Sequence, residues 1–416
     1  MVTEAPAREE AAEPARRPLL EPRQGTPDSV ETAADLARTA ADFAAGTGPV
    51  AVDAERASGY RYGQRAYLVQ LRREGAGTAL IDPVCCPDLG IIDTALADVE
   101  WVLHAASQDL PCLAELGLRP RRLFDTELAG RLAGFERVGL GTMVEQVLGY
   151  TLEKGHSAAD WSVRPLPQAW LTYAALDVEL LIELRDALEA ELQRQHKLDW
   201  AREEFDALVS APPPAIRAEP WRRTSGIHRV RAPRGLAVVR ELWQTRDSIG
   251  RTQNTAPGRI LPDSAIVAAA LANPASAHAL LLVPVFGGRA TRRQVNVWYE
   301  AIERARALAP PDLPQIRAET EGPPPAHRWR DREPAAAARL AAAKERVLVV
   351  AEQHSVPVEN LLSPDLVRRL AWAPPDPTTE DTVAGALLAG GARPWQVGLT
   401  AAELAVALTA TVPVPD

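Results

Sequence analysis

The sequence is poor in cysteine and lacks long apolar runs, and each shortage argues against a class of protein. Its three cysteines, Cys85, Cys86 and Cys112, are too few for a disulfide framework, and no Cys/His cluster has the spacing of a zinc site. No run of about 18 apolar residues occurs, which argues against a membrane-spanning helix. The phosphate loop GxxxxGKS or GxxxxGKT is absent, which excludes a helicase motor. We therefore expect a cytoplasmic protein with reduced thiols and no membrane partner.

Length and charge set further bounds. A chain of 416 residues exceeds what one hydrophobic core usually supports, so two to four domains are expected. The net charge of −9 argues against a protein that coats nucleic acid indiscriminately. Acidic metal ligands together with a local basic strip remain compatible with that charge. Residues 1–30 open with an Ala/Glu/Pro-rich stretch that has no apolar signal segment, which predicts a disordered tail.

Residues 31–210 alternate between strand-like and helix-like patterns. Residues 32–46 have the spacing of an amphipathic helix that ends at Gly46. Short apolar runs predict strands at residues 49–52, 66–71, 78–81 and 101–104. A helix-like stretch at residues 107–117 and the short FDTEL at 124–128 follow, and from there to about Leu208 the pattern is helical. These elements predict an α/β domain, with a mixed sheet flanked by helices.

Two proline-rich stretches divide the rest of the chain. Residues 211–220 contain too many prolines for a helix or a central strand, which indicates a linker. Residues 309–329 form a second such stretch. The regions between and after them, 221–308 and 330–416, have helical apolar spacing. We expect two small all-α domains there.

The first predicted strand ends in two acids, Asp53 and Glu55. Side chains alternate along a strand, so the two carboxylates project from the same side. Adjacent carboxylates repel each other, and a hard divalent cation with oxygen ligands relieves that repulsion. Alone, such a pair could simply end a strand and cap a turn.

Two further acidic motifs follow. Asp109 stands in the first helical turn after the strand at 101–104, where the helix dipole by itself would favour an acid. Tyr173 and Asp177 are four residues apart within a helical stretch and so share one face. Taken alone, they could be a hydrogen-bonded surface pair.

The order and spacing of these motifs are more specific than any one of them. A DxE on the first strand, an Asp about 55 residues later and a YxxxD about 65 residues after that resemble the DEDD exonuclease superfamily with a tyrosine in its final motif. The chain is most similar to its ribonuclease D family, over roughly residues 48–205. The stretches that carry this likeness are LHAASQDL at 103–110, FDT at 124–126, ADWSVRPL at 159–166 and YAALDV at 173–178.

The resemblance implies a ribonuclease H-like fold and hydrolysis assisted by two divalent ions, Mg²⁺ or Mn²⁺. In this family pattern, Asp53 would bridge both ions, and Glu55 and Asp177 would complete the site of the ion that holds the nucleophilic water. Asp109 would support the second ion, and Tyr173 would orient the water. The implied activity is 3′→5′ removal of nucleoside 5′-monophosphates from RNA, with tRNA precursors as the implied partner and no obligate protein partner. A DNA 3′→5′ exonuclease and an inert nucleic-acid-binding scaffold remain alternatives.

Several neighbours of the acids are candidates for RNA contact. Trp161 and Arg164 could meet terminal nucleotides by stacking and phosphate contact, or could pack within their loop. His104 and Gln108 flank the second acidic motif, and His104 has a structural role as its alternative. The cluster at residues 60–62 could line the groove or form a surface turn.

A basic segment opens the first helical region. Between Ile216 and Ile260, ten arginines stand against three acidic residues, a local charge of +7. This predicts a footprint for a phosphate backbone, with Arg246 and Arg251 as candidate contacts; a solvated arginine-rich face is the alternative. The segment resembles the HRDC domain, a small helical nucleic-acid-binding module, although this chain has Gly250 and Asn254 where alanine and aspartate are common. Residues 330–416 resemble a second, more divergent HRDC-like domain.

Overall fold

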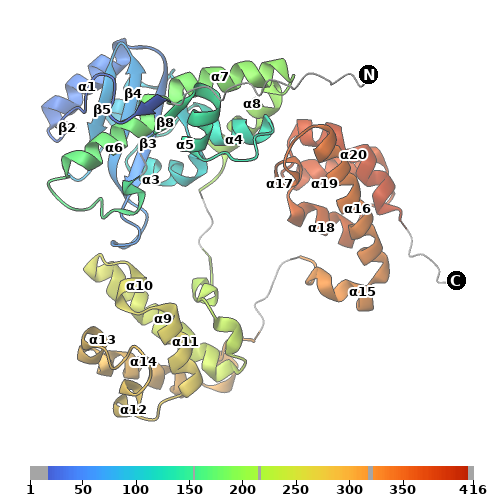
Figure 1. The fold of residues 1–416 in the computed structure, drawn as a ribbon. Helices are drawn as coiled ribbons and strands as arrows, with labels where there is room; N and C mark the ends of the chain where they lie inside the picture. The colour runs from blue at the N-terminus through green and yellow to red at the C-terminus, as the bar shows by residue number, and fades with distance from the viewer. Residues whose placement is uncertain (1–16, 153–154, 214–216, 317–321, 411–416) are drawn as a thin grey trace, which may run out of the picture.

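The chain folds into three domains (Figure 1). The computed structural model describes residues 17–152, 155–213, 217–316 and 322–410. An α/β domain is drawn in blue to green, a first helical domain in yellow and a second in orange to red. The boundaries follow the two proline-rich stretches. Among the described residues, no helix is both long enough and apolar enough to cross a membrane.

A mixed sheet organises the α/β domain. Its six strands lie in the order β2-β5-β4-β3-β6-β7. Antiparallel pairing joins β3 to β4 and β4 to β5, whereas β2 with β5, β3 with β6 and β6 with β7 are parallel. The strands of the sheet are β2 (Ser29–Val30), β3 (Thr47–Arg56), β4 (Ala66–Glu74), β5 (Gly77–Ile81), β6 (Glu100–Leu103) and β7 (Arg122–Asp125). The predicted mixed sheet is therefore confirmed.

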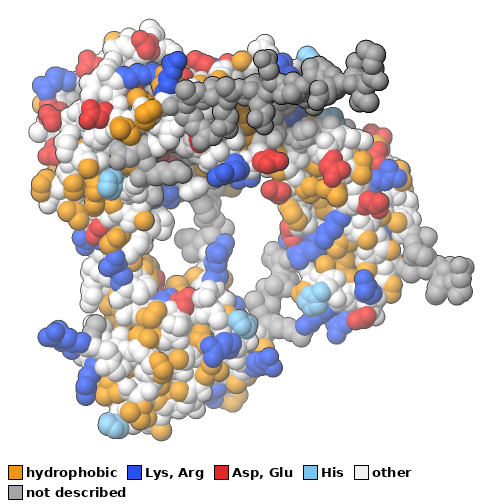
Figure 2. Space-filling model, viewed as in Figure 1, with side chains coloured by type: hydrophobic (Ala, Val, Ile, Leu, Met, Phe, Trp, Pro, Cys, Tyr) orange, Lys and Arg blue, Asp and Glu red, His pale blue; other side chains and the backbone are white. Residues whose placement is uncertain are grey.

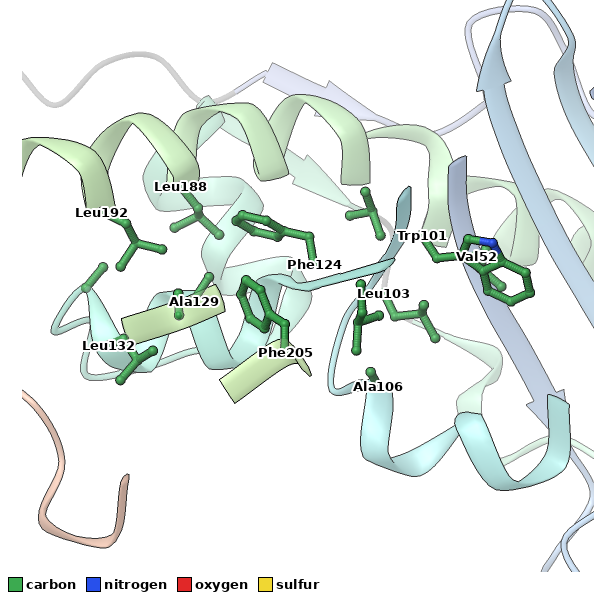
Figure 3. Packing of buried hydrophobic residues seen from close by; sticks show 14 of the residues in the cluster. Val52, Trp101, Leu103, Ala106, Phe124, Ala129, Leu132, Leu188, Leu192 and Phe205 are labelled. Carbon is green, nitrogen blue, oxygen red and sulfur yellow. The ribbon is translucent and has the colours of Figure 1, made fainter. Parts of the chain in front are cut away.

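Helices cover the sheet and bury its apolar side chains. Phe124 of β7 packs against Phe205 of α8 with ring centroids 4.9 Å apart, and Trp101 of β6 lies beside Val52 of β3 (Figure 3). The helical segments are α1 (Ala33–Ala45), α2 (Gly90–Ala95), η1 (Ala106–Gln108), α3 (Leu110–Glu115), α4 (Thr126–Leu132), α5 (Leu140–Met143), η2 (Val144–Leu148), η3 (His156–Ala158), α6 (Gln168–Glu179), α7 (Leu181–Arg194) and α8 (Leu198–Ser210). This core holds the carboxyl ends of β3 and β6 in fixed positions.

The predicted disordered tail is wrong for residues 17–30. Strand β1 (Arg17–Leu19) pairs in parallel with β8 (Tyr150–Leu152), and β2 extends the main sheet by pairing with β5. Arg23 also forms an ion pair with Glu183 at 2.6 Å. Exposed strand edges elsewhere in the domain supply the backbone partners that this segment cannot supply for itself. Residues 1–16 of the expected tail lie outside the described residues.

The first helical domain has a core of its own, which includes Trp221, Leu242 and Trp298. Helix α9 runs through its centre and packs against α11 and α14. The helical segments are η4 (Pro220–Arg223), η5 (Ile227–Arg229), α9 (Pro233–Gln253), α10 (Pro257–Ile260), α11 (Asp263–Ala272), α12 (Ala277–Leu281), α13 (Arg289–Arg293), α14 (Val295–Ala307) and η6 (Pro310–Asp312).

The core of the second helical domain is continuous with that of the α/β domain. At the junction, Trp200 of α8 stacks on Trp395 of α20 with ring centroids 5.0 Å apart. The helical segments are η7 (Ala326–Arg328), α15 (Trp329–Arg332), α16 (Pro334–Gln353), α17 (Val358–Leu361), α18 (Pro364–Trp372), α19 (Glu380–Ala389) and α20 (Pro394–Leu408). The expectation of two all-α domains is confirmed.

Candidate active site

Strand β3 presents the first two acids at its carboxyl end. Its apolar residues Val50 to Val52 are buried in the middle of the sheet. The pairing of β3 with β6 ends at Ala51, so Asp53 and Glu55 lie beyond the end of the neighbouring strand. The two acids are two residues apart in a strand and therefore point to the same side.

Helix α6 brings the third motif to the same place. Its buried residues Ala174, Ala175 and Val178 face the domain interior, where the helix packs on β3, β4 and β5. One carboxylate oxygen each from Asp53, Glu55 and Asp177 lies within 4.8 Å of the others. The predicted convergence of two separate motifs is thus present, with all-oxygen ligands suited to a hard divalent ion.

Asp109 approaches from the other side through a shaped loop. Asp125, at the end of β7, accepts hydrogen bonds from the N–H groups of Ala105 at 3.0 Å and Ala106 at 2.9 Å. It also caps α4. Ala105 adopts a left-handed conformation with φ of 61°. This turn sets Asp109 at the start of α3, near Asp53 but outside the group of three close carboxylates.

The surroundings of the site disfavour the charged forms of its acids. Burial raises the pKa of Glu55 to about 10, and repulsion from Asp53 and Asp177 adds to the effect. Burial likewise raises the pKa of Asp109 to about 8, with the Asp53 charge contributing. Burial raises the pKa values of Asp53 and Asp177 too, and that of the Tyr173 phenol, which stays protonated at neutral pH. Such a group of poorly hydrated acids is a natural cation site.

Arg56 is a site residue that the sequence analysis missed. Its guanidinium lies 3.3 Å from an Asp109 carboxylate oxygen and donates a hydrogen bond to the Gln108 carbonyl at 2.9 Å. It therefore holds Asp109 next to β3. The available signal was an arginine directly after the DxE motif, but its partner is 53 positions away in the chain.

The predicted RNA contacts of Trp161 and Arg164 are corrected. Trp161 is fully buried and packs against Trp170, with ring centroids 5.4 Å apart, and near Tyr173. Arg164 forms a two-pronged ion pair with Asp82 at 2.6 and 2.7 Å. Although burial acts in the opposite direction, this pairing holds the pKa of Asp82 below its usual range. Trp161 is thus part of the domain interior, and the guanidinium of Arg164 is occupied by partners within the domain.

The His104 side chain is hydrogen-bonded within the domain, whereas the Gln108 side chain is exposed. The His104 ring shares a hydrogen bond of 2.9 Å with the Thr126 hydroxyl, and burial lowers its pKa to about 4. This supports the structural alternative for His104. The Gln108 side chain is exposed beside Asp109, where it remains a candidate for substrate contact.

Many arginines of the predicted basic segment are committed to the fold. Arg246 is buried and forms an ion pair with Asp263 at 2.6 Å, so its predicted RNA contact is corrected. Arg234 donates to backbone carbonyls at the end of α14. Arg251 is exposed but contacts Tyr62 and Asp247. On the face seen in Figure 2, Lys and Arg side chains of this domain stand in separate groups and do not form one continuous strip.

A pocket of about 330 Å³ adjoins the carboxylates. Its lining residues include Glu55, Arg56, Gly59, Tyr60 and Ala158. Because Glu55 belongs to both, a group bound in this pocket lies next to the cation site.

Comparison with known families identifies three matching regions. Residues 27–193 match the family described as 3'-5' exonuclease, and residues 235–302 match the HRDC domain. Residues 322–408 match the family described as 3' to 5' exonuclease C-terminal domain. The second helical domain thus has a family description separate from that of the HRDC domain.

Whole-chain relatives cover most of this sequence. Ribonuclease D of Gluconacetobacter diazotrophicus is 33% identical over 337 residues, which is 78% of this chain and 81% of that protein. A protein from Bifidobacterium adolescentis of known crystal structure is 38% identical, with a TM-score of 0.88, over 95% of this chain and 100% of that one. Escherichia coli RNase D is 26% identical, with a TM-score of 0.65, over 83% and 89% of the two chains.

Proposed function

Since this chain belongs to the ribonuclease D family and is a 3′→5′ exoribonuclease, we propose that Asp53, Glu55, Asp109 and Asp177 bind two divalent ions, Mg²⁺ or Mn²⁺, for its reaction. The convergence of carboxylate oxygens from Asp53, Glu55 and Asp177 within 4.8 Å carries this proposal. Asp53 is the common neighbour, because its charge acts on Glu55, Asp109 and Asp177 alike. It is therefore the acid that would help to hold both ions.

Tyr173 and Arg56 position other groups of the site. Two bound divalent ions supply an activated water and offset the charge of the attacked phosphate. The phenol of Tyr173 remains protonated beside Asp177, so it orients a water by hydrogen bonding and does not act as a base. Arg56 holds Asp109 close to Asp53. The bond that breaks joins the phosphate to the 3′-oxygen of the preceding sugar, and a nucleoside 5′-monophosphate leaves.

We propose structured RNA with a free 3′ end as the substrate, and tRNA precursors in particular. The Escherichia coli relative is described as an exoribonuclease involved in structured RNA processing. The HRDC domain supplies a second nucleic-acid-binding module on the same chain. The three free thiols Cys85, Cys86 and Cys112 fit a reducing cytoplasm.

Trimming of a tRNA precursor by the full chain, with Mg²⁺, Mn²⁺ or a chelator, tests this function. We expect release of 5′-monophosphates with either metal and none with the chelator. Asp53→Ala should lower the rate roughly a thousandfold or more, because metal ions contribute several kcal/mol of transition-state stabilisation. RNA binding should persist, since the HRDC domain is unchanged. Asp206→Ala, an exposed acid in α8, is the matched control and should retain full activity.

Matched RNA and DNA oligonucleotides separate the alternatives. Preferred hydrolysis of DNA would identify a DNA exonuclease, since only contacts to the 2′-hydroxyl distinguish the two substrates. Binding of RNA without release of mononucleotide from any 3′ end would identify an inert scaffold and reject the proposed chemistry.

A further inference from the structure

The segment Gly59–Tyr62 connects the pocket beside Glu55 to the first helical domain. It begins three residues after the end of β3, and Gly59 and Tyr60 line the pocket. In Figure 1 the α9 and α10 end of the yellow domain lies against this part of the α/β domain. One short segment therefore forms both a wall of the pocket and a contact between domains.

Helix α10 and the residue before it hold the start of this segment. Arg259 donates a hydrogen bond to the Gly59 carbonyl at 2.7 Å, and its guanidinium lies 4.0 Å above the Tyr60 ring. The Ala256 N–H donates to the Tyr60 carbonyl at 3.0 Å. The backbone carbonyls of Gly59 and Tyr60 thus both accept hydrogen bonds from the first helical domain.

Helix α9 holds the end of the segment. The Tyr62 hydroxyl donates to an Asp247 carboxylate oxygen at 2.9 Å, and Arg251 lies over the Tyr62 ring. Gly250 lets the ring approach, because a Cβ at that position would stand 3.1 Å from a ring carbon of Tyr62. A glycine in the middle of a helix costs up to about 1 kcal/mol relative to alanine, and close approach of Tyr62 gives it a purpose here.

The same segment also contacts residues 158 and 162, which are far from it in the sequence. The Tyr60 hydroxyl donates to the Ala158 carbonyl at 3.3 Å, and Arg61 donates to the Ser162 hydroxyl at 2.6 Å. Ala158 lines the pocket too. Tyr60 therefore joins two parts of the pocket lining that are distant in the sequence.

We propose that α9 and α10 brace the Gly59–Tyr62 segment and thereby set the shape of the pocket that receives the terminal nucleotides of RNA. The first helical domain then acts on the active site directly, in addition to holding distant parts of the RNA. Arg259 and Tyr62 are positioning residues in this arrangement. The inference rests on the proposed function, because it assigns the pocket beside Glu55 to the RNA end.

A tetranucleotide RNA tests the brace, since it is too short to reach from the pocket across the helical domain. We expect Arg259→Ala in the full chain to raise KM for the tetranucleotide roughly tenfold, the effect of losing a charged hydrogen bond, with kcat changed by less than about twofold. Tyr62→Phe removes a single hydroxyl and should raise KM about threefold. Arg259→Lys keeps a cation near Tyr60 and should recover part of the loss.

Arg306→Ala is the matched control. Arg306 lies over the Tyr299 ring at 6.0 Å and donates to the Pro274 carbonyl at 2.6 Å, so it makes the same kinds of contact within the helical domain itself. It should leave KM for the tetranucleotide unchanged. Thermal unfolding of each variant reports whether the domains remain folded.

A binding measurement separates the brace from the hydrolysis. In chelator, the tetranucleotide should bind Asp53→Ala about tenfold more tightly than it binds the Asp53→Ala, Arg259→Ala double variant. Absence of hydrolysis by the wild type rejects the proposed function but leaves this comparison intact. Unchanged KM and Kd for the tetranucleotide in folded Arg259→Ala and Tyr62→Phe, with weaker binding of long structured RNA alone, would overturn the brace in favour of a simple tether.

Discussion

His104 stands one residue past β6, and its imidazole is held without charge. Burial lowers its pKa to about 4, whereas the free side chain titrates near pH 6.5. The neighbouring Glu127 acts in the opposite direction but does not prevail. On acidification, the unfolded chain therefore binds a proton at this residue before the folded chain does. The stability that neutral His104 contributes is complete above about pH 6.5 and is lost as the pH falls toward 4.

Replacement of His104 by Asn tests this pH dependence. The asparagine keeps a neutral polar group near the Thr126 hydroxyl but cannot titrate. Between pH 7 and pH 4, we expect the free energy of unfolding to fall further for the wild type than for His104→Asn. The difference should be up to about 3 kcal/mol, and the partial exposure of the ring reduces it. Denaturant titrations at several pH values measure this. Parallel curves for the two proteins would show that His104 titrates normally.

The acidic residues could be predicted from sequence because their signals are local. Asp53 and Glu55 follow an apolar run that dictates a strand, and Tyr173 and Asp177 have helical spacing. Trp161 and Arg164 could not be placed in the same way. The partner of Arg164 is Asp82, 82 positions earlier, and only the folded sheet brings the two together. The local sequence around an arginine is the same whether its guanidinium contacts phosphate or a buried carboxylate.

At the scale of the element, α9 contains a glycine, Gly250, that is unfavourable for a helix but allows close contact with Tyr62. Gly250 lies within the helix and is buried against Tyr62. Alanine at an ordinary helical position stabilises by roughly 0.5–1 kcal/mol relative to glycine. At Gly250, a Cβ would also come within 3.0 Å of the Thr255 carbonyl oxygen. The gain in helix propensity and the loss of packing therefore oppose each other.

We expect Gly250→Ala to give no increase in the free energy of unfolding. Gly385 in α19 is the matched control, because nothing lies within 4 Å of a Cβ built there. Gly385→Ala should stabilise by up to about 1 kcal/mol. Chemical denaturation of both variants measures the difference. Equal stabilisation by the two substitutions would mean that Tyr62 does not press on α9.

Strand β1 of the two-stranded sheet and strand β2 at the edge of the main sheet mark where sequence-based prediction of elements failed. Strands β3 to β6 contain apolar runs that form strands in any packed sheet, and they were found. Strands β1 and β2 have three and two residues and no apolar alternation. Their strand conformation comes from pairing with β8 and β5, partners more than 45 residues away. Such induced elements have no local pattern from which to predict them.

At the scale of the whole molecule, we expect the α/β domain and the second helical domain to unfold as one cooperative unit. They share a hydrophobic core, and Glu204 of α8 lies buried at their junction. Burial raises the pKa of Glu204, although Arg393 at 3.3 Å counteracts it. Its carboxylate accepts hydrogen bonds from the Trp395 indole at 3.0 Å and the Gln396 amide at 3.1 Å. The first helical domain, in contrast, has a separate core.

Glu204→Ala should destabilise these two domains together. Removing the carboxylate leaves buried donors of Trp395 and Gln396 without an acceptor, which costs roughly 3 kcal/mol. Asp199→Ala on the same helix is the control, because Asp199 is exposed and its ion pair with Arg202 contributes little. Hydrogen exchange of the full chain should show faster exchange in α8, α16 and α20 but not in α9 or α14. Equal loss of protection in α9 and α14 would mean that all three domains unfold as one. The Gly59–Tyr62 contacts would then couple the first helical domain to the rest as strongly as a shared core does.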